Sequence, residues 1–451
     1  MSVGDVTIGI DIGTTSVKAV AADGHGRVLG RVRLPHRLIV PAPDRLEHDA
    51  NQAWRLGPRR ALTRLAGFGP RAVAISSLVP SMTAVDAHGR PLTPGLLYGD
   101  ARGSGRQAGR WTGADDGEIV GFVHWSAAAA PQAAGYWPAP AVATFALARE
   151  AVIDFATAAS SAPLFDGAGW DAALCASCGV GAEQLPKVAG MGTAIGRDRD
   201  TGALVAAGGV DALCEGIVAG AGRPGDVLVH CGTTLIVWVT TTEPRAAPGL
   251  WTTPSLAGQL WQVGGPSNAG GLFLGWLARV LGRDADAPPP DPGNVPVWVP
   301  YIRGERALHH DPSLRASLHG LDLTHGPAAL RRAGFEAAGF VVRHVVDTVG
   351  APVHRVVAAG GGTRVPGWMQ AIADCTGLPV HVPAVPEGAA LGAAWLARMG
   401  AGLERELGDA ARWAATDRVL EPDPSWQAAA AERYLAFCSL AGPSRGSGGP
   451  T

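Results

Sequence analysis

One short pattern occurs twice in the chain, and it is the strongest constraint on the fold. Residues 6–12 form an apolar, strand-like run, Gly13-Thr14-Thr15 forms a turn, and residues 16–22 form a second strand-like run. The same order of strand, Gly-Thr-Thr and strand occurs at 226–240. Two strands joined by a tight, glycine-containing turn predict a β-hairpin. Because a repeated unit indicates repeated architecture, we expect two related lobes that each carry one such hairpin.

Length and composition are those of a globular protein with more than one core. A chain of 451 residues exceeds one ordinary domain, and its hydrophobic content is 47%. The 63 glycines and 35 prolines are many, yet below the range of low-complexity disorder. The formal net charge is −2, whereas nucleic-acid and membrane-surface binders usually carry a basic excess. We therefore expect neither nucleic acid nor membrane as a partner.

Lysine and cysteine usage exclude further classes. Lys18 and Lys187 are the only lysines, and neither lies in a Gly-x-x-x-x-Gly-Lys-Ser/Thr context, which excludes a P-loop NTPase. Six cysteines are too few for a disulfide scaffold. Cys175 and Cys178 form one Cys-x-x-Cys, and we favour ordinary helix residues over a redox or metal site because no second pair completes a zinc site. The N-terminus lacks the basic start of a signal peptide and prolines interrupt the apolar stretch 127–148, so we expect a cytoplasmic protein.

The two Gly-Thr-Thr turns are candidate phosphate-binding loops. Glycine exposes backbone N–H groups and threonine adds hydroxyl donors, so such turns bind phosphate oxygens without a lysine. Asp11 precedes the first turn and could hold a hydrated Mg²⁺. Each turn alone is more typical of an ordinary hairpin, but the two turns together with Asp11 and the glycine cluster at 360–362 favour a triphosphate site. The cluster Gly360-Gly361-Gly362 could admit a flat ring or a phosphate, or could form only a tight strand-to-helix turn.

Asp211 permits two interpretations. It follows Gly208-Gly209-Val210 and begins a segment with helical spacing, so it could be an ordinary N-cap residue. It could also be a carboxylate at a domain junction that accepts a hydroxyl proton, which is the group that phosphoryl transfer to an alcohol needs. The residues alone leave both interpretations open.

These segments belong to a longer ordered series. In chain order its members are 9–18, 208–212, 224–234, 268–271 with Trp276, Pro300-Tyr301-Ile302-Arg303-Gly304-Glu305-Arg306, 360–370 with Asp374, and 387–394. In content and order the series resembles the motifs of the FGGY carbohydrate kinases, with a xylulokinase-like layout, over most of the chain up to residue 400.

The resemblance implies an α/β fold of two ribonuclease-H-like domains of the actin and sugar-kinase superfamily, which flank an ATP cleft. We expect an N-terminal domain for sugar and phosphate binding at 1–207, an ATP-binding domain at 208–425, and a partly disordered tail at 426–451. It further implies ATP and Mg²⁺ as cofactors, a small sugar or polyol as substrate, and a homodimer as a family expectation.

The resemblance also assigns roles by position. Asp211 becomes the general base and Asp11 the carboxylate linked to Mg²⁺. Phosphate and nucleotide contacts fall on Gly13, Thr14, Thr15, Gly232, Thr233, Gly271, Gly361 and Gly362.

The acceptor site departs from the family pattern. Where the xylulokinase-like branch has Gln-Met-His-Gly, the chain reads Leu78-Val79-Pro80-Ser81-Met82, which makes Ser81 and Met82 candidate substrate contacts. Tyr98-Gly99-Asp100-Ala101-Arg102 stands where the family has Trp-x-Asp-x-Arg. Asp100 could bind a polyol or form a structural ion pair with Arg102. The chain is also shorter than the family pattern over residues 120–155.

The sequence therefore predicts an ATP-dependent kinase that phosphorylates a sugar or polyol, such as the pentulose xylulose. A sugar- or nucleotide-binding sensor that has lost catalysis is the alternative, although Asp11 and Asp211 are both present. An actin-like or chaperone-like ATPase would need an appended polymerising or peptide-binding segment, and the sequence shows no such segment.

Overall fold

The chain divides into two compact units, described from a computed structural model. The structure describes residues 5–42, 44–104, 118–254, 260–282 and 290–442. The first unit comprises residues 1–218 and 387–413, and the second comprises 219–386 and 414–451. None of the helices in these described ranges is long and apolar enough to cross a membrane.

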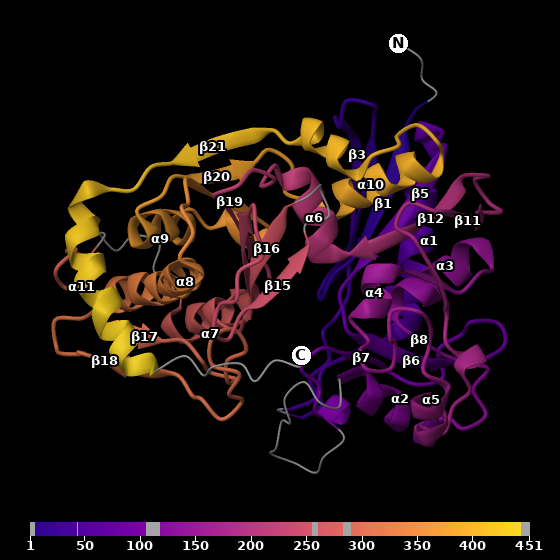
Figure 1. The fold of residues 1–451 in the computed structure, drawn as a ribbon, viewed down its shortest axis with the longest axis horizontal. Helices are drawn as coiled ribbons and strands as arrows, with labels where there is room; N and C mark the ends of the chain where they lie inside the picture. Colours follow the sequence, from indigo (N-terminus) through magenta and orange to yellow (C-terminus); the bar gives the residue numbers. More distant parts are fainter. Residues whose placement is uncertain (1–4, 43, 105–117, 255–259, 283–289, 443–451) are drawn as a thin grey trace. The chain divides into compact units, whose positions relative to one another are not determined.

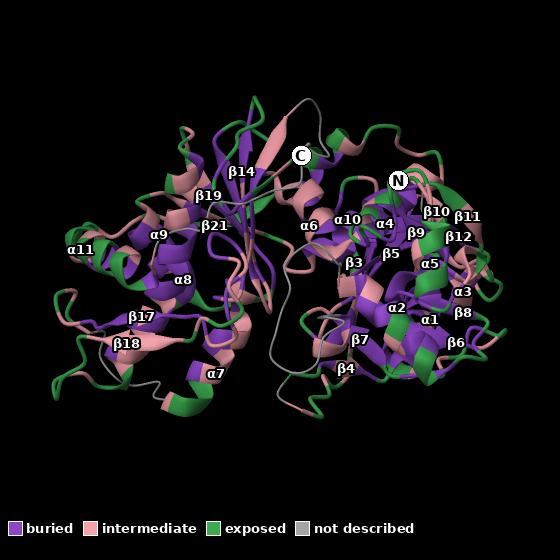
Figure 2. Cartoon of the chain, turned by 60° about the horizontal axis from the view of Figure 1, so that its bottom comes forward, coloured by how far each residue is buried: buried purple, intermediate pink, exposed green. Residues whose placement is uncertain are grey.

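A six-stranded sheet forms the centre of the first unit (Figure 1). Its strands, in spatial order, are β11 (Ala194–Arg197), β12 (Leu204–Val210), β5 (Ala72–Ser77), β1 (Thr7–Ile12), β2 (Ser16–Ala22) and β3 (Val28–Pro35). β1 and β2 form an antiparallel hairpin, while β1, β5 and β12 run parallel. β1 and β5 are buried along their whole length, so the centre of this sheet is also the core of the unit (Figure 2).

Smaller elements surround this sheet. A second sheet has the order β4 (Glu47–His48), β7 (Gly95–Leu97), β6 (Ser81–Val85) and β8 (Gly135–Trp137), and β9 (Val152–Asp154) pairs with β10 (Lys187–Ala189). The α-helices are α1 (Gly57–Leu65), α2 (Glu118–Ala129), α3 (Ala139–Ala148), α4 (Phe155–Ala159), α5 (Ala172–Ser177), α6 (Asp211–Ala219) and α10 (Gly388–Gly400). A π-helical turn, Asn51–Leu56, leads into α1, and Pro58 lies in the first turn of that helix, where proline is tolerated. The described residues of the unit also include four 3₁₀ segments, which are Ala66–Phe68, Ala101–Ser104, Ala182–Gln184 and Leu407–Trp413.

The second unit repeats the central arrangement of strands. Its seven-stranded sheet has the order β15 (Trp251–Pro254), β16 (Trp261–Ser267), β14 (Leu235–Thr241), β13 (Asp226–Cys231), β19 (Arg355–Ala359), β20 (Val380–Pro383) and β21 (Thr416–Leu420). β13 and β14 form the antiparallel hairpin, and β19 runs parallel to β13, as β5 does to β1. The predicted repeat of a Gly-Thr-Thr hairpin in two lobes is therefore confirmed.

Four described helices accompany the seven-stranded sheet of this unit. They are α7 (Gly271–Leu281), α8 (Pro327–Val349), α9 (Pro366–Thr376) and α11 (Pro424–Ala441), with a 3₁₀ turn at Gly361–Arg364 and a small ladder of β17 (Val297–Val299) and β18 (Ser317–His319). The largest apolar cluster of the unit contains Phe340 and Trp368 and is formed by residues from the sheet, α8, α9 and α11.

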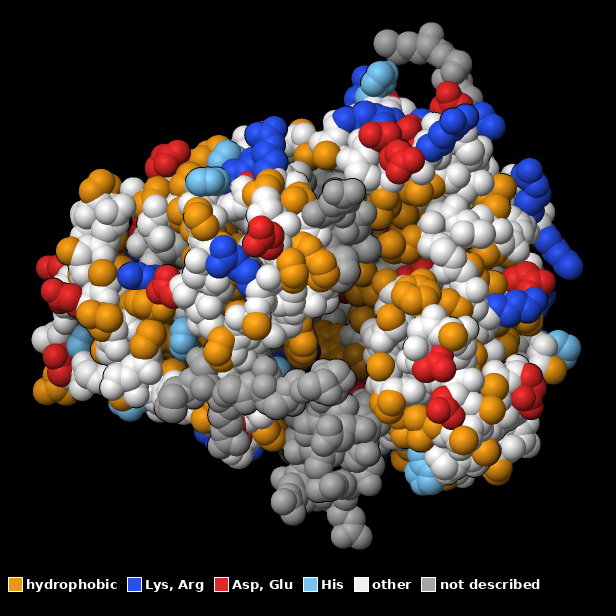
Figure 3. All heavy atoms as spheres, in the orientation of Figure 1, with side chains coloured by type: hydrophobic (Ala, Val, Ile, Leu, Met, Phe, Trp, Pro, Cys, Tyr) orange, Lys and Arg blue, Asp and Glu red, His pale blue; other side chains and the backbone are white. Residues whose placement is uncertain are grey.

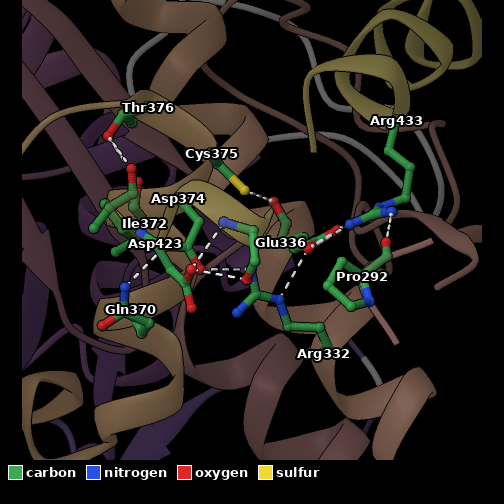
Figure 4. A network of polar contacts seen from close by, with 12 residues as sticks. Pro292, Arg332, Glu336, Gln370, Ile372, Asp374, Cys375, Thr376, Asp423 and Arg433 are labelled. Carbon is green, nitrogen blue, oxygen red and sulfur yellow. Dashed lines mark hydrogen bonds and ion pairs between the residues drawn. The ribbon is translucent and has the colours of Figure 1, made fainter. Parts of the chain in front are cut away.

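A buried ion network fixes α11 to α8 and α9 (Figure 4). Arg433 Nε and Nη2 donate to the Glu336 carboxylate at 2.7 and 2.8 Å, and Arg332 joins Glu336 at 2.9 Å to Asp374 at 2.7 Å. Glu336 and Asp374 are 0% and 3% exposed. Asp374, which the resemblance grouped with residues 360–370, thus takes part in a structural network of this unit, which includes a hydrogen bond from the Asp423 N–H at 2.8 Å.

The observed division of the chain differs from the predicted boundaries in three places. β12 pairs with β5 as far as Val210, so the first segment of the first unit extends beyond residue 207. α10 belongs to the first unit, because its backbone approaches β1 so closely that a Cβ at Gly9 would overlap the Ala390 carbonyl. Residues 426–441, predicted as part of a partly disordered tail, form most of helix α11. The rest of the predicted tail, 443–451, lies outside the described residues.

Charges of both signs are interspersed on the face of the molecule that Figure 3 presents. The formal net charge of −2 reflects nearly equal numbers of basic and acidic residues, 37 and 39.

Candidate active site

Three polar residues lie at or near the carboxyl ends of adjacent parallel strands in the first unit. Asp11 is near the end of β1 and pairs in register with Ser76 of β5, and Asp211 follows β12 directly as the first residue of α6. Ser76 Oγ lies 3.4 Å from Asp11 Oδ1. Because parallel strands bring their carboxyl ends to one edge of a sheet, the fold gathers the predicted metal carboxylate and the predicted base at the same edge.

Lys18 joins this group, a role that the sequence did not reveal. Lys18 lies on the neighbouring strand β2, and its Nζ is 3.2 Å from Asp11 Oδ2. Asp11 raises the pKa of Lys18 above its ordinary value, Glu215 and Asp211 add to this effect, and burial opposes it. The ammonium group of Lys18 therefore interacts electrostatically with the carboxylates of Asp11, Glu215 and Asp211. The facing pair Asp11 and Lys18 in the hairpin register was the available signal, since opposite charges attract across an antiparallel ladder.

Asp211 also has a local contact at its helix. Its Oδ1 accepts a hydrogen bond of 2.7 Å from the Ala212 N–H, and its side chain is half-buried. This contact belongs to the start of a helix, which is one of the two interpretations that the sequence left open. The position of Asp211 after β12, at the same edge of the sheet as Asp11, agrees with the other interpretation, and the two are compatible.

The first turn, Gly13–Thr15, is held by residues from three other segments. The Gly13 N–H donates to the Ser16 carbonyl at 3.1 Å, which closes the turn. The Thr14 hydroxyl lies 3.0 Å from the Tyr98 hydroxyl, and the Thr14 carbonyl lies 2.8 Å from His48 Nε2. The His36 N–H donates to the Thr15 carbonyl at 3.0 Å. His48 and Tyr98 therefore act on the turn, although neither was a candidate in the sequence.

In the second unit the second turn, Gly232–Thr234, and the start of α7 are hydrogen-bonded to each other. The Gly271 N–H donates to the Gly232 carbonyl at 2.9 Å, and the Leu272 N–H donates to the Thr233 carbonyl at 3.0 Å. A Cβ at Gly271 would lie 2.6 Å from the Gly232 carbonyl oxygen, so this contact requires glycine. Gly232, Thr233 and Gly271 thus form one backbone cluster.

The glycine cluster 360–362 lies beside the same turn. Gly360 has φ +91°, and a Cβ there would lie 2.9 Å from the Cys231 carbonyl oxygen, directly before the second turn. At Gly362 a Cβ would overlap the Trp368 ring, whereas at Gly361 it would meet no atom within 4 Å. Five predicted nucleotide and phosphate residues of this unit therefore gather where β13 and β19 end: Gly232, Thr233, Gly271, Gly361 and Gly362.

Glu305 accepts hydrogen bonds from residues that precede α7. Its Oε2 accepts from the Ser267 hydroxyl at 2.8 Å and from the Asn268 N–H at 3.2 Å, while Oε1 accepts from the Arg306 N–H at 2.8 Å. Burial raises the pKa of Glu305 to about 7, against the opposing effect of these bonds. The Pro-Tyr-Ile-Arg-Gly-Glu-Arg segment thus holds the turn that precedes the helix start.

The candidate acceptor residues Ser81 and Met82 lie on β6 with buried side chains. Ser81 Oγ accepts from the Ala139 N–H at 3.0 Å, and Met82 belongs to an apolar cluster that also contains Cys175 and Cys178. They are 1% and 2% exposed. The half-exposed residues of the preceding turn are Val79 and Pro80.

Asp100 uses its carboxylate within the chain. It accepts from Arg102 Nε at 2.8 Å and Nη2 at 2.6 Å, and from the Leu46 N–H at 2.7 Å. Arg102 also reaches Glu47 at 2.6 Å. These are the contacts of the structural ion pair, one of the two alternatives that the sequence left open for Asp100.

The donor set at Asp11 suits one type of Mg²⁺ site. The described residues contain no cluster of three or more His, Cys, Asp or Glu side chains that could hold a metal. Mg²⁺ at phosphate-transfer sites needs only one or two carboxylates, with water and phosphate oxygens as the other ligands. A buried carboxylate such as Asp11, next to a predicted phosphate turn, fits that type of site.

Comparison with known proteins agrees with this geometry. The sequence patterns of the N-terminal and C-terminal domains of the FGGY family of carbohydrate kinases match residues 6–108 and 227–401. The chain belongs to the FGGY family of carbohydrate kinases. This FGGY kinase is therefore a phosphotransferase, and its family uses ATP.

Individual relatives match the FGGY kinase along most of its length. It is 25% identical to a gluconokinase of Bacillus subtilis over 443 residues, covering 86% of each chain. It is 29% identical to a xylulose kinase of Streptomyces rubiginosus over 435 residues, covering 87% of each. The solved xylulose kinase of Rhodospirillum rubrum matches with a TM-score of 0.76 at 26% identity, covering 96% of this chain and 98% of the other. The predicted two-domain α/β fold of the actin and sugar-kinase superfamily is therefore confirmed.

Proposed function

We propose that this FGGY kinase transfers the γ-phosphate of ATP to a hydroxyl group of a pentulose such as xylulose. The observation that carries the proposal is the convergence of Asp11 and Asp211 at one edge of the first sheet, where both act on Lys18. One carboxylate beside a phosphate turn and a second at the same edge of the sheet are what metal-assisted transfer to an alcohol requires.

Asp211 acts as the general base in this proposal. The acceptor oxygen forms a bond to the γ-phosphorus, the bond from phosphorus to the β,γ-bridging oxygen breaks, and ADP leaves. The hydroxyl proton passes to the carboxylate of Asp211. This residue begins α6 and is half-buried. Such a base contributes about 10²- to 10⁴-fold to the rate.

The remaining predicted residues bind the donor. Backbone N–H groups and hydroxyls of Gly13, Thr14 and Thr15 in the first unit, and of Gly232 and Thr233 in the second, contact phosphate oxygens. Gly271, Gly361 and Gly362 form the bare backbone that the nucleoside meets. Asp11 holds Mg²⁺, which when bound neutralises charge on the phosphate oxygens.

The acceptor site is proposed to include the segments 78–82 and 98–102. The side chains of Ser81, Met82 and Asp100 are buried. In this proposal they therefore act on the acceptor site indirectly, through the residues that they contact. Asp100 fixes Arg102 and, through it, Glu47. The relatives named as gluconokinase and xylulose kinase match at similar identity, so the choice of pentulose rests on the xylulokinase-like motif layout.

An ADP-release screen with Mg²⁺ tests the proposal. Xylulose, ribulose, gluconate and glycerol are offered at equal concentration, and release without acceptor is the control. We expect pentulose-dependent release that exceeds release with gluconate by at least tenfold. A preference for gluconate or glycerol contradicts the substrate class, and the absence of acceptor-dependent release with any sugar or polyol contradicts kinase activity.

A further inference from the structure

His48 is a buried histidine directly behind the first turn, and the kinase assignment gives it no role. It lies on the two-residue strand β4 and is 0% exposed. Its Nε2 lies 2.8 Å from the Thr14 carbonyl oxygen, and its Nδ1 lies 3.0 Å from Trp54 Nε1. Both ring nitrogens are therefore engaged, one by the turn and one by the interior of the unit.

The two partners fix the protonation state of the ring. The indole N–H of Trp54 can only donate, so His48 Nδ1 must be the acceptor and carry no proton. The carbonyl of Thr14 can only accept, so Nε2 must carry the proton and donate it. Only one neutral tautomer satisfies both bonds. Burial lowers the pKa of His48 to about 4, and neighbouring His36 adds to the effect, which agrees with a neutral ring.

The bond to Thr14 determines how the turn presents its backbone. In a planar trans peptide the C=O and the following N–H point in opposite directions. Because His48 holds the Thr14 carbonyl toward the interior, the N–H of Thr15 is directed away from His48. Thr15 is exposed, so a phosphate can approach this part of the turn.

Neighbouring contacts reinforce this orientation. The next carbonyl, that of Thr15, is held by the His36 N–H at 3.0 Å. The Thr14 side chain is held by the Tyr98 hydroxyl at 3.0 Å. The carbonyls of Thr14 and Thr15 are thus both held by hydrogen bonds from histidine N–H groups. The backbone of the turn is therefore preorganised before a ligand binds.

We propose, resting on the proposed phosphate-binding function of the first turn, that His48 is a positioning residue for the phosphate donor: its Nε2–H holds the Thr14–Thr15 peptide in the orientation that the phosphate meets. The alternative is that His48 only stabilises the fold. A positioning role changes the kinetics toward ATP, whereas a purely structural role changes only the free energy of unfolding.

Two amide substitutions separate the ring nitrogens. His48→Gln places an amide N–H near the position of Nε2 and keeps the bond to Thr14. His48→Asn reaches only the position of Nδ1, so it keeps an acceptor for Trp54 and loses the bond to Thr14. We expect kcat/KM for ATP to fall about tenfold in His48→Asn and at most threefold in His48→Gln, with the KM for the acceptor within twofold in both.

Tyr136→Phe is the matched control. Tyr136 is 1% exposed and donates a buried hydrogen bond of 3.1 Å to the Ala130 carbonyl in the same unit, a bond that does not involve the first turn. We expect this variant to lose stability while keeping the wild-type kcat/KM for ATP. Equal ATP kinetics in His48→Asn and His48→Gln would overturn the proposal.

ADP binding, measured by calorimetry without acceptor, keeps this inference separable from the proposed function. If wild-type protein fails to bind ADP, the proposed function fails. If wild-type protein binds ADP and His48→Asn binds it equally well, only the role of His48 fails. Should His48→Asn not fold, the ¹⁵N shifts of the His48 ring in wild-type protein decide: we expect the Nε2–H tautomer at pH 7 and a change on ADP binding. A charged ring, the Nδ1–H tautomer or unchanged shifts would overturn the proposal.

Discussion

Gly361 and Gly362 are adjacent glycines whose surroundings differ, and alanine at each position tests the nucleotide site. A Cβ at Gly361 meets no atom within 4 Å. A Cβ at Gly362 overlaps the Trp368 ring and lies 2.8 Å from the Cys231 carbonyl oxygen. Neither residue is among the glycines with positive φ, so both backbones accept an alanine. One glycine is therefore required for internal packing, and the other leaves its side-chain direction open.

The expected magnitudes follow from these contacts. Ordinary van der Waals contact begins near 3.4 Å, so Gly362→Ala forces the Trp368 ring and the end of β13 apart, which costs about 1–3 kcal/mol of the free energy of unfolding. Gly361→Ala meets no clash, and reduced freedom of the unfolded chain offsets small losses, so its stability changes by about 0.5 kcal/mol or less. If the nucleoside contacts this backbone, the new methyl group occupies its space and weakens ADP binding at least tenfold, or about 1.4 kcal/mol.

Urea unfolding without ligand and calorimetric titration with ADP measure the two effects separately. We expect Gly361→Ala to unfold like the wild type and to bind ADP weakly. We expect Gly362→Ala to unfold at lower urea. Wild-type ADP affinity in Gly361→Ala would refute the placement of the nucleoside at this backbone, and wild-type stability in Gly362→Ala would refute the packing argument.

Three further predictions concern stability and pH. The unfolded His48 imidazole takes up a proton near pH 6.5 and the folded one only near pH 4, so wild-type protein loses up to about 3 kcal/mol between these values as the pH falls, and His48→Gln lacks this component in urea titrations at each pH. Arg433→Met leaves the buried Glu336 carboxylate with one arginine instead of two, and we expect calorimetry to record a loss of about 3 kcal/mol; an unchanged midpoint would contradict the buried network. Asp100→Asn weakens the hydrogen bonds from Arg102, and we expect the free energy of unfolding to fall by about 2 kcal/mol while the KM for the acceptor is unchanged. A raised KM with wild-type stability would indicate direct contact between Asp100 and the acceptor.

Much of the fold follows from local sequence. The hairpins at the two Gly-Thr-Thr turns are predictable because alternating apolar runs and a glycine turn specify a hairpin over a few residues. Helix α8, Pro327–Val349, is predictable in the same way, because proline lies in its first turn and its apolar spacing is regular. Candidate residues at strand ends are likewise predictable, because the fold class places those ends together.

The assignment of α10 could not be predicted, because it depends on contacts between residues far apart in the sequence. The helix packs on β1 at Gly9, where a Cβ would overlap the Ala390 carbonyl, and on α6 at Gly392, where a Cβ would overlap the Cys214 carbonyl. Nothing local to 388–400 distinguishes the sheet of the first unit from that of the second. Helix α11 was detectable, because Asp423 caps it by accepting from the Ser425 N–H at 2.9 Å and Pro424 starts its first turn.

The roles of His48 and Lys18 were missed for different reasons. The bond from His48 to Thr14 joins residues 34 positions apart, and the supporting Trp54 indole becomes a neighbour only when the π-helical turn forms. Lys18 lies in an apolar run that predicts a strand, and only the hairpin register places it opposite Asp11. Apolar periodicity alone cannot indicate such a pair.

The most direct test of the central claim is the rate of phosphate transfer in Asp211→Asn, measured in a single turnover with bound ATP, Mg²⁺ and acceptor, alongside ADP affinity. Asparagine keeps the size of the side chain and an oxygen for the Ala212 N–H, but it cannot accept the hydroxyl proton. We predict ADP affinity within twofold of wild type and a transfer rate lower by about 10²- to 10⁴-fold. A wild-type transfer rate in this variant would contradict the assignment of Asp211 as the base.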